Sequence, residues 1–289
     1  MDIKTYLYKH YQPSSAKCYL REINYYLQRT PTAATADYKT VLAYIKEQRK
    51  SQKSASLNRI LQSIKKYYNY LIYIEKREDN PAAEIQIKDY HSRGYLDGKR
   101  LLSPAELDQL WQHFLTRKNR YKLLKNRNIS MTGLLIHQGL TSGEIRKLTT
   151  QNIDLEAAKV KIPKSVRQQA RHLKLHASQI LPLYKYLNED RPNLLNTEVE
   201  ALFVNKLGQA ESGETLHYLL QTARPYFKPH KFNPKTIRMS VIARKFKEGL
   251  PLLEVQYFAG HYTPSSTERY KTSDLEALKQ SILKYHPLS

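Results

Sequence analysis

Apolar residues in the first 80 positions recur at the spacing of amphipathic helices. Lysines and arginines fill the intervening positions, so each stripe predicts a helix with one buried face. Asn80-Pro81 is expected to end the last of these helices, because a residue that precedes proline avoids the α region. The pattern therefore predicts an all-helical domain over residues 1–86. The three stripes consist of Tyr19, Ile23, Tyr26 and Leu27; of Val41, Leu42 and Ile45; and of Leu57, Ile60, Leu61, Ile64, Tyr68 and Leu71.

The pattern changes after residue 86. The stretch "IKDYHSRGYLDGK", residues 87–99, is polar, contains two glycines and has no period, which predicts a linker. In "LLSPAELDQLW", Ser103 is a predicted helix N-cap, Pro104 takes the first helical position and Glu106 completes a capping box. We expect this second domain to span residues 100–289.

Two further patterns complete the expected fold. A helix is predicted to end near Gln138-Gly139, and "NIDLEAAKVKIPKSVRQQARHLKLH" alternates like a small hairpin or three-stranded sheet around a basic turn. Helical spacing returns from Leu216 onward, and an apolar stripe in residues 275–289 predicts an amphipathic helix at the C-terminus. The fold class is therefore mainly α with a small β-sheet, arranged as two domains.

Charge narrows the function. The chain has 48 Lys and Arg against 26 Asp and Glu, for a net charge of +22. Residues 1–99 hold 18 basic and 10 acidic side chains, and the remainder holds 30 and 16, so both domains are basic. A field of this kind favours polyanions, and phosphate neutralisation dominates nucleic-acid affinity. Nucleic acid is thus the expected partner, and the alternatives are an acidic membrane surface or a soluble protein that is basic without such a partner.

Several classes are disfavoured. Cys18 is the only cysteine, which argues against disulfide frameworks and cysteine-rich zinc sites and favours a reducing cytoplasm. His172 and His176 have helical metal-ligand spacing, but nothing nearby completes a site, and we expect no metal or cofactor. The N-terminus has no signal-peptide pattern, no apolar run reaches the ~20 residues of a membrane span, and common phosphate-loop, dinucleotide and hydrolase motifs are lacking.

The remaining chemistry lies in the last 130 or so residues, as the set Lys164, Lys235, Arg238, His261 and Tyr270. Cutting a phosphodiester without a metal needs a nucleophile, cations at the non-bridging oxygens and an acid for the leaving oxygen. This set contains all three. Each member also has an ordinary alternative, namely a solvated surface lysine, a helix-surface arginine, a histidine at a helix C-terminus and one tyrosine among 23.

The joint spacing resembles the C-terminal signature of the tyrosine recombinases, or phage-integrase family. In "KTIRMSVIARKFKEGLPLLEVQYFAGHYTPSSTERY", Arg238 follows Lys235 by three residues, His261 follows Arg238 by 23, and Tyr270 follows His261 by nine. "HQGLTSGEIRKLTTQNIDLE" resembles the family's upstream turn, and Lys164 falls where the family has its β-hairpin lysine. The resemblance covers nearly the whole chain, since the basic helical segment suits the family's core-binding domain.

The resemblance implies a role for each residue. Tyr270 would attack the phosphate and form a covalent 3′-phosphotyrosine, which conserves the bond energy for religation. Arg238 would hold a phosphate oxygen in fork geometry, and His261 would donate a hydrogen bond to it. Lys164 would protonate the departing 5′ oxygen, and Lys235 would add a second cation.

One position departs from the family pattern. The family's first arginine belongs where this chain has Thr141, in "GLTSGE", and Thr141 with Glu144 reads as a helix capping box. Losing a charged phosphate contact typically costs a few kcal/mol of transition-state stabilisation. Arg167 and Arg171 on the basic turn are the expected substitutes. Arg146, about 140° around a regular helix from the missing arginine, is a poorer one, and His137 is weaker still.

The resemblance therefore implies site-specific DNA breakage and rejoining in the cytoplasm, at the nucleoid. It implies a homo-tetramer on two DNA sites, with the C-terminal helix docked on a neighbouring protomer or, more plainly, on its own domain. A simple two-domain enzyme of Xer-like, invertase or transposon-borne type is expected, without an arm-binding domain. Two alternatives stay open: a DNA-binding or architectural relative with a weakened site, suggested by Thr141, and a relaxing enzyme of type IB topoisomerase kind.

Overall fold

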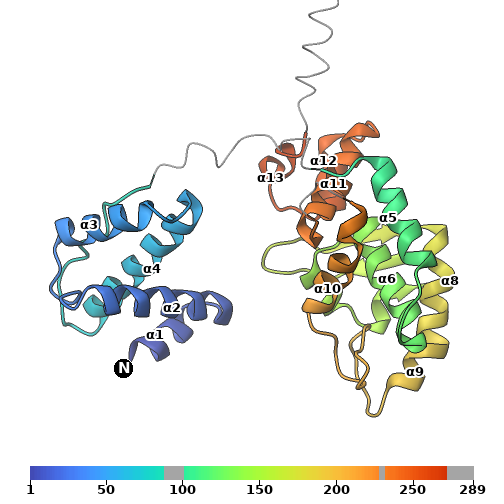
Figure 1. Cartoon of the computed structure of the whole chain (residues 1–289), viewed down its shortest axis with the longest axis horizontal. Helices are drawn as coiled ribbons and strands as arrows, with labels where there is room; N and C mark the ends of the chain where they lie inside the picture. Colours follow the sequence, from blue (N-terminus) through green and yellow to red (C-terminus); the bar gives the residue numbers. More distant parts are fainter. Residues whose placement is uncertain (88–100, 228–231, 272–289) are drawn as a thin grey trace, which may run out of the picture. The chain divides into compact units, whose positions relative to one another are not determined.

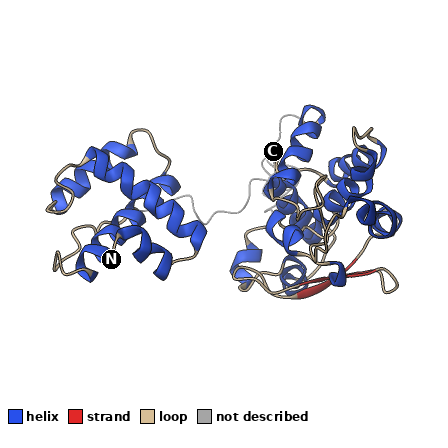
Figure 2. Ribbon diagram, turned by 90° about the horizontal axis from the view of Figure 1, so that it is seen from below, coloured by secondary structure: helices blue, strands red, loops and turns tan. Residues whose placement is uncertain are grey.

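A computed structural model describes residues 1–87, 101–227 and 232–271. The described residues fall into two compact units, within Met1–Arg93 and Gly94–Ser289 (Figure 1). The expected linker, residues 87–99, lies outside the described residues except for Ile87, and so does the expected helix in residues 275–289. The fold class is confirmed: the chain is mainly helical with one small sheet (Figure 2).

In its described part, residues 1–87, the N-terminal unit has four helices, α1 (Ile3–His10), α2 (Pro13–Arg29), α3 (Tyr38–Arg49) and α4 (Ser54–Tyr73). The stripe predicted on α4 is buried as expected, and α2 packs against it. Tyrosines form part of this core without leaving buried hydroxyls unpaired. Tyr26 Oη lies 2.6 Å from Tyr68 Oη, which donates to Ala33 O at 2.9 Å. The first helix, α1, was not predicted by any of the three stripes.

The predicted end of α4 is wrong by several residues. The helix stops at Tyr73, well before Asn80-Pro81, because Glu75 adopts a left-handed conformation with φ 56°. The N–H of Lys76 then reaches back to Leu71 O at 3.0 Å, and that of Glu75 to Ile72 O at 2.9 Å. This is the hydrogen-bond pattern of a Schellman C-cap, usually marked by glycine. A glutamate in that position gives no such signal in the sequence.

The C-terminal unit is built around α6 (Lys125–Ile136), whose residues from Arg127 onward are all buried. Helix α5 (Pro104–Thr116) packs on it and begins with the predicted capping box of Ser103 and Glu106. The described part of the unit also contains the helices α7 (Ser142–Lys147), α8 (Ala177–Lys185), α9 (Arg191–Leu194), α10 (Glu214–Ala223), α11 (Pro234–Lys247), α12 (Leu252–Ala259) and α13 (Pro264–Glu268). Four short helical turns complete it: η2 (Lys122–Leu124), η3 (Thr150–Asn152), η4 (Tyr186–Asp190) and η5 (Arg224–Tyr226).

The predicted sheet has three antiparallel strands in the order β1 (Ile153–Asp154), β2 (Lys159–Ile162) and β3 (Arg171–Lys174), and it lies along one edge of the helices (Figure 2). Val160 pairs with Leu173 and Ile162 pairs with Arg171. Alternate residues of a strand share a face, so Arg171 lies on the buried face together with Leu173. The turn between β2 and β3 contains two further basic residues, Lys164 and Arg167. Across the described ranges, no helix is long and apolar enough to cross a bilayer.

Candidate active site

Arg238 lies inside the C-terminal unit on α11, with 6% of its surface exposed. The helix begins at the N-cap Asn233, whose side chain accepts the N–H of Thr236 at 3.0 Å. The Arg238 guanidinium donates to Gly139 O and to Ala259 O, both at 2.5 Å. These carbonyls belong to the turn after α6 and to the end of α12. Two backbone segments therefore fix the orientation of this cation.

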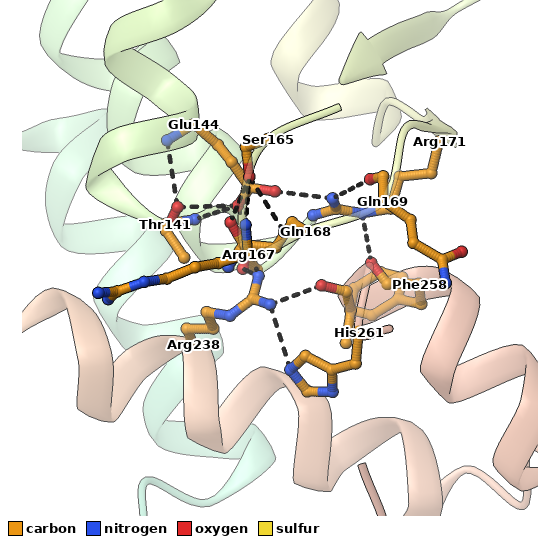
Figure 3. Close-up of polar contacts among 12 residues, drawn as sticks. Thr141, Glu144, Ser165, Arg167, Gln168, Gln169, Arg171, Arg238, Phe258 and His261 are labelled. Carbon is orange, nitrogen blue, oxygen red and sulfur yellow. Dashed lines mark hydrogen bonds and ion pairs between the residues drawn. The ribbon is translucent and has the colours of Figure 1, made fainter. Parts of the chain in front are cut away.

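Arg171, on β3, is a second buried arginine in the same place (Figure 3). Its Nη1 donates to Glu144 Oε1 at 2.7 Å, and its Nε donates to Phe258 O at 2.8 Å. Its Nη2 is buried and has no hydrogen-bond partner. The guanidinium packs directly on Gly260, which has φ 71°, and a Cβ on Gly260 would collide with it. The glycine of the Gly-His pair is thus required twice, by its backbone conformation and by Arg171.

Glu144 connects the two arginines. Its Oε2 lies 3.6 Å from Arg238 Nη1, while Oε1 pairs with Arg171. Burial alone raises the pKa of this carboxyl, but Arg171 and then Arg238 outweigh it, so the pKa lies below its usual value. Oε2 also accepts from Thr141 N at 2.8 Å and Thr141 Oγ1 at 2.9 Å. The predicted capping box of Thr141 and Glu144 is confirmed, and its carboxylate is also the counter-ion of the site.

His261 follows α12 and faces Arg238. Its Nε2 lies 3.5 Å from Arg238 Nη2, and its Nδ1 lies 2.8 Å from Thr267 Oγ1. Burial, with the charges of Arg238 and Arg171, lowers the pKa of His261 to about 4. The imidazole is therefore neutral at pH 7. Because Arg238 can only donate, Nε2 is the acceptor in this arrangement and Nδ1–H donates to Thr267.

Tyr270 lies beside His261. The two rings stack with centroids 5.6 Å apart at 21°, and the N–H of Tyr270 donates to Thr267 O at 2.9 Å. The phenol is half-buried against a small apolar cluster of Ile242, Val255 and Ala259. The structure thus brings together four members of the expected constellation or its substitutes: Arg171, Arg238, His261 and Tyr270.

Four other predicted residues are exposed. Lys164 is the second residue of the β2–β3 turn, Arg167 lies further along it, and Lys235 is in the first turn of α11. Arg146 is exposed on α7. Among the three arginines expected to replace the missing one, Arg171 is thus the one that pairs with Glu144.

His137 lies in different surroundings. Its ring stacks on His176 at 4.5 Å and meets the edge of Trp111 at 4.8 Å. Burial, and then the charge of His176, lowers its pKa to about 4. It lines a cavity of about 700 Å³ together with Asp108, Arg244 and other residues. Within the described ranges, no group of three or more His, Cys, Asp or Glu side chains has the geometry of a metal site.

Two contributors were not predicted in their present roles. Glu144 served in the sequence only to set the register of the Thr141 turn, and its pairing with Arg171 joins residues 27 positions apart. Thr267, which fixes His261, is one of several small hydroxyl residues in "TPSST", and the sequence does not distinguish it from its neighbours.

A family profile, two curated proteins and a solved structure match most of the chain. The profile described as "Phage integrase family" matches residues 100–276. Tyrosine recombinase XerD of Shewanella oneidensis is 27% identical over 274 residues, covering 93% of this chain and 88% of that protein. Tyrosine recombinase XerC of Histophilus somni is 25% identical, covering 92% and 84%. The XerH site-specific recombinase bound to a palindromic difH substrate superposes with a TM-score of 0.72 at 17% identity, covering 92% of this chain and 78% of that one.

Proposed function

The chain belongs to the phage integrase family, and we propose that it breaks and rejoins duplex DNA at specific sites through a 3′-phosphotyrosine on Tyr270. The observation that carries this proposal is a connected set of side chains: two buried arginines share the carboxylate of Glu144, a neutral histidine lies against Arg238, and Tyr270 stacks on that histidine. The arginines supply positive charge for a phosphate, and the tyrosine supplies the nucleophile.

The proposed reaction has two half-steps. In the first, Tyr270 Oη attacks the scissile phosphorus, its proton passes to solvent, the Oη–P bond forms and the P–O5′ bond breaks. The leaving O5′ takes a proton from the Lys164 ammonium. In the second, a 5′ hydroxyl attacks the phosphotyrosine and the same changes run in reverse. The number of ester bonds is unchanged, so the proposed cycle needs neither a cofactor nor ATP.

The arginines and the histidine would stabilise the charge that develops on the phosphate. Two backbone carbonyls hold the Arg238 guanidinium in place. Its remaining N–H groups would donate to the non-bridging oxygens without a rearrangement of the backbone. A phosphate placed beside His261 raises the pKa of the imidazole, since an anion favours the charged form. His261 would then donate to the phosphate, and Lys235 at the start of α11 would add a cation.

Arg171 is our candidate for the arginine that Thr141 replaces. It is buried, it shares Glu144 with Arg238, and its Nη2 has no partner. A guanidinium whose other donors are already fixed presents its remaining N–H groups in a defined direction. Arg167 and Arg146 have the same charge but are exposed.

Duplex DNA is the proposed partner of both domains, with residues 1–86 as the core-binding domain and 100–289 as the catalytic domain. The excess of basic side chains in both parts of the chain supports this. We further propose a homo-tetramer on paired sites, in the cytoplasm at the nucleoid. The XerH recombinase structure is a post-cleavage complex with a palindromic difH substrate, which supports the proposal that this chain also cleaves DNA.

The test is covalent capture on DNA. The wild-type protein, incubated with a pool of nicked random-sequence duplexes, is expected to form a denaturation-resistant adduct on a subset of sequences, and sequencing that subset gives the target. Tyr270→Phe removes only the phenol oxygen, so it is expected to abolish the adduct while binding in a mobility-shift assay stays within about threefold. Adducts that persist in Tyr270→Phe would assign the nucleophile elsewhere. A wild-type protein that binds but never forms adducts would favour the architectural alternative, and relaxation of plasmids without a target would favour the topoisomerase-like one.

A further inference from the structure

The β2–β3 turn, residues 163–170, is attached to the segment that carries His261. Gln169 N donates to Gly260 O at 2.9 Å, which fixes the end of the turn that leads into β3. Tyr262 Oη donates to Ser165 O at 2.8 Å, which fixes the end that follows β2. Ser165 is the residue directly after Lys164. The turn that presents the proposed acid is therefore held at both ends by Gly260 and Tyr262.

The Tyr262 backbone is itself fixed. Gln256 Nε2 on α12 donates to His261 O at 3.1 Å and is 3.4 Å from Tyr262 O. The peptide that carries His261 is thus anchored to α12, and the Tyr262 side chain projects from this anchored point to the turn. A displacement of one loop would be transmitted to the other through this phenol at Ser165 and through the hydrogen bond between Gln169 and Gly260.

The turn is also closed on itself. Ser165 N donates to Gln168 O at 2.9 Å, and Ser165 Oγ accepts from Gln168 N at 3.0 Å. A hydrogen bond at Ser165 O therefore orients the whole turn, including the exposed Lys164, and not one peptide alone. An exposed lysine loses side-chain entropy when it is fixed, so the orientation of the backbone that carries it affects how often Nζ reaches the leaving oxygen.

We propose that Tyr262 is a positioning residue that holds the Lys164 turn against the His261 segment, so that the leaving-group acid and the phosphate site are assembled together. This proposal rests on the proposed role of Lys164. The variant Tyr262→Phe removes only the hydroxyl that donates to Ser165 O and keeps the aromatic ring. Because Tyr262 is 42% exposed, we expect this variant to fold like the wild type.

The matched control is Tyr257→Phe. Tyr257 is also exposed, at 52%, and its Oη accepts the N–H of His172 at 3.1 Å. It therefore contacts the same hairpin, but on β3, beyond the turn. Hydrogen exchange measured by mass spectrometry on the free protein is the first readout. Tyr262→Phe is expected to speed exchange of peptides that cover residues 163–170 severalfold, while Tyr257→Phe leaves those peptides unchanged. Equal exchange in Tyr262→Phe and the wild type would overturn the proposal.

The second readout separates positioning of the acid from general damage. The substrates are the captured target duplex with its natural scissile phosphate and the same duplex with sulfur in place of the bridging 5′ oxygen. A thiolate leaves without a proton, so it bypasses the need for Lys164. Tyr262→Phe is expected to slow cleavage of the oxygen substrate by about tenfold, a part of the 10²–10⁴ typical of acid catalysis, and to cleave the sulfur substrate at the wild-type rate. Lys164→Ala is expected to show a larger defect with the same rescue.

The outcomes distinguish the two hypotheses. If sulfur rescues Lys164→Ala but not Tyr262→Phe, the hydroxyl acts on His261 or Tyr270, and the positioning proposal is wrong while the role of Lys164 stands. If sulfur does not rescue Lys164→Ala, Lys164 is not the acid, and the positioning proposal fails with it. The double variant that combines Lys164→Ala with Tyr262→Phe is expected to cleave no more slowly than Lys164→Ala. Once the lysine is absent, the position of the turn no longer affects proton transfer to the leaving oxygen.

Discussion

The two sides of the candidate site hold their side chains in opposite ways. On the buried side, Arg171 and Arg238 are fixed by Glu144 and by four backbone carbonyls, and little of either is exposed. On the other side, Lys164 and Lys235 are exposed. Tyr270 is half-buried and follows α13, which is mostly exposed. The proposed phosphate-holding charges are rigid, and the proposed proton donor and nucleophile are accessible.

This difference follows from what each group is asked to do. A cation that stabilises developing charge is most effective when its environment needs no reorganisation, and burial in a hydrogen-bonded network achieves this. Burial is unfavourable for an unpaired cation, so Glu144 is needed as a counter-ion. A group that must meet DNA has to approach from the surface. The comparison predicts that changes on the buried side affect both the fold and the reaction, and that changes on the exposed side affect the reaction alone.

The largest effect on the buried side is expected for Arg171. In Arg171→Lys the positive charge beside Glu144 is kept, but the fork geometry is lost, so single-turnover cleavage of the nicked target should fall by about a hundredfold or more. DNA affinity should change little, because one contact among many neutralises about one phosphate. Quenched-flow cleavage and mobility shifts measure the two separately.

Arg167→Ala is the matched control for Arg171→Lys. Arg167 lies four residues earlier in the same hairpin and is exposed, so its loss should leave the chemical step within about threefold of the wild type. Thermal unfolding of both variants checks the fold. If Arg171→Lys is folded and cleaves like the wild type while Arg167→Ala is slow, the substitute for the family arginine is on the exposed side. That result would contradict the assignment of the phosphate-holding charges to the buried side.

The sequence predicted the linear part of this site better than its three-dimensional part. Lys235, Arg238, His261 and Tyr270 lie within 36 residues, and the resemblance of their joint spacing to the family signature marked them as candidates. Whether Arg167 or Arg171 is buried depends on the residue at which β3 begins, because side chains alternate between the two faces of the sheet from that residue onward. The pairing of Arg171 with Ile162 places it on the buried face, and a basic turn of several residues gives no local signal for that register.

The same limit applies to the fold. The apolar stripes of α2 and α4 were readable because helical spacing repeats over several turns. The end of α4 was misplaced because it depends on one residue, Glu75, in a conformation that glutamate rarely adopts. Periodic features are thus predictable from sequence, while single-residue features depend on tertiary contacts.

A smaller effect is expected from pH. The folded-state pKa of His261 is about 4, below its ordinary value of about 6.5, so protons bind preferentially to the unfolded chain in between. The free protein should therefore have its full histidine-related stability above about pH 6.5 and lose part of it as the pH falls toward 4. Urea unfolding at pH 7 and pH 5 measures this as a drop in the midpoint concentration.

His261→Gln sharpens this prediction. His137 also has a pKa lowered to about 4 and contributes its own part of the drop, so the variant should lose less stability than the wild type between pH 7 and pH 5 but still lose some. An unchanged drop in His261→Gln would mean that His261 is not buried against Arg238 in the free protein.

The smallest effect is expected at Thr141, the position that the sequence resemblance aligns with the family's first arginine. If Arg171 already serves the phosphate, Thr141→Arg should raise single-turnover cleavage by no more than a few fold. It should also destabilise the protein by about 1 kcal/mol, because Thr141 Oγ1 accepts the N–H of Glu144 at 3.1 Å as the cap of α7. Thr141→Ala loses the same cap without adding charge, so the difference between the two variants isolates the effect of the guanidinium. A strong rise in rate for Thr141→Arg, without one for Thr141→Ala, would show that the wild-type site lacks a phosphate ligand. If the wild-type protein does not cleave at all and Thr141→Arg does, the wild-type protein is a DNA-binding relative and not an active recombinase.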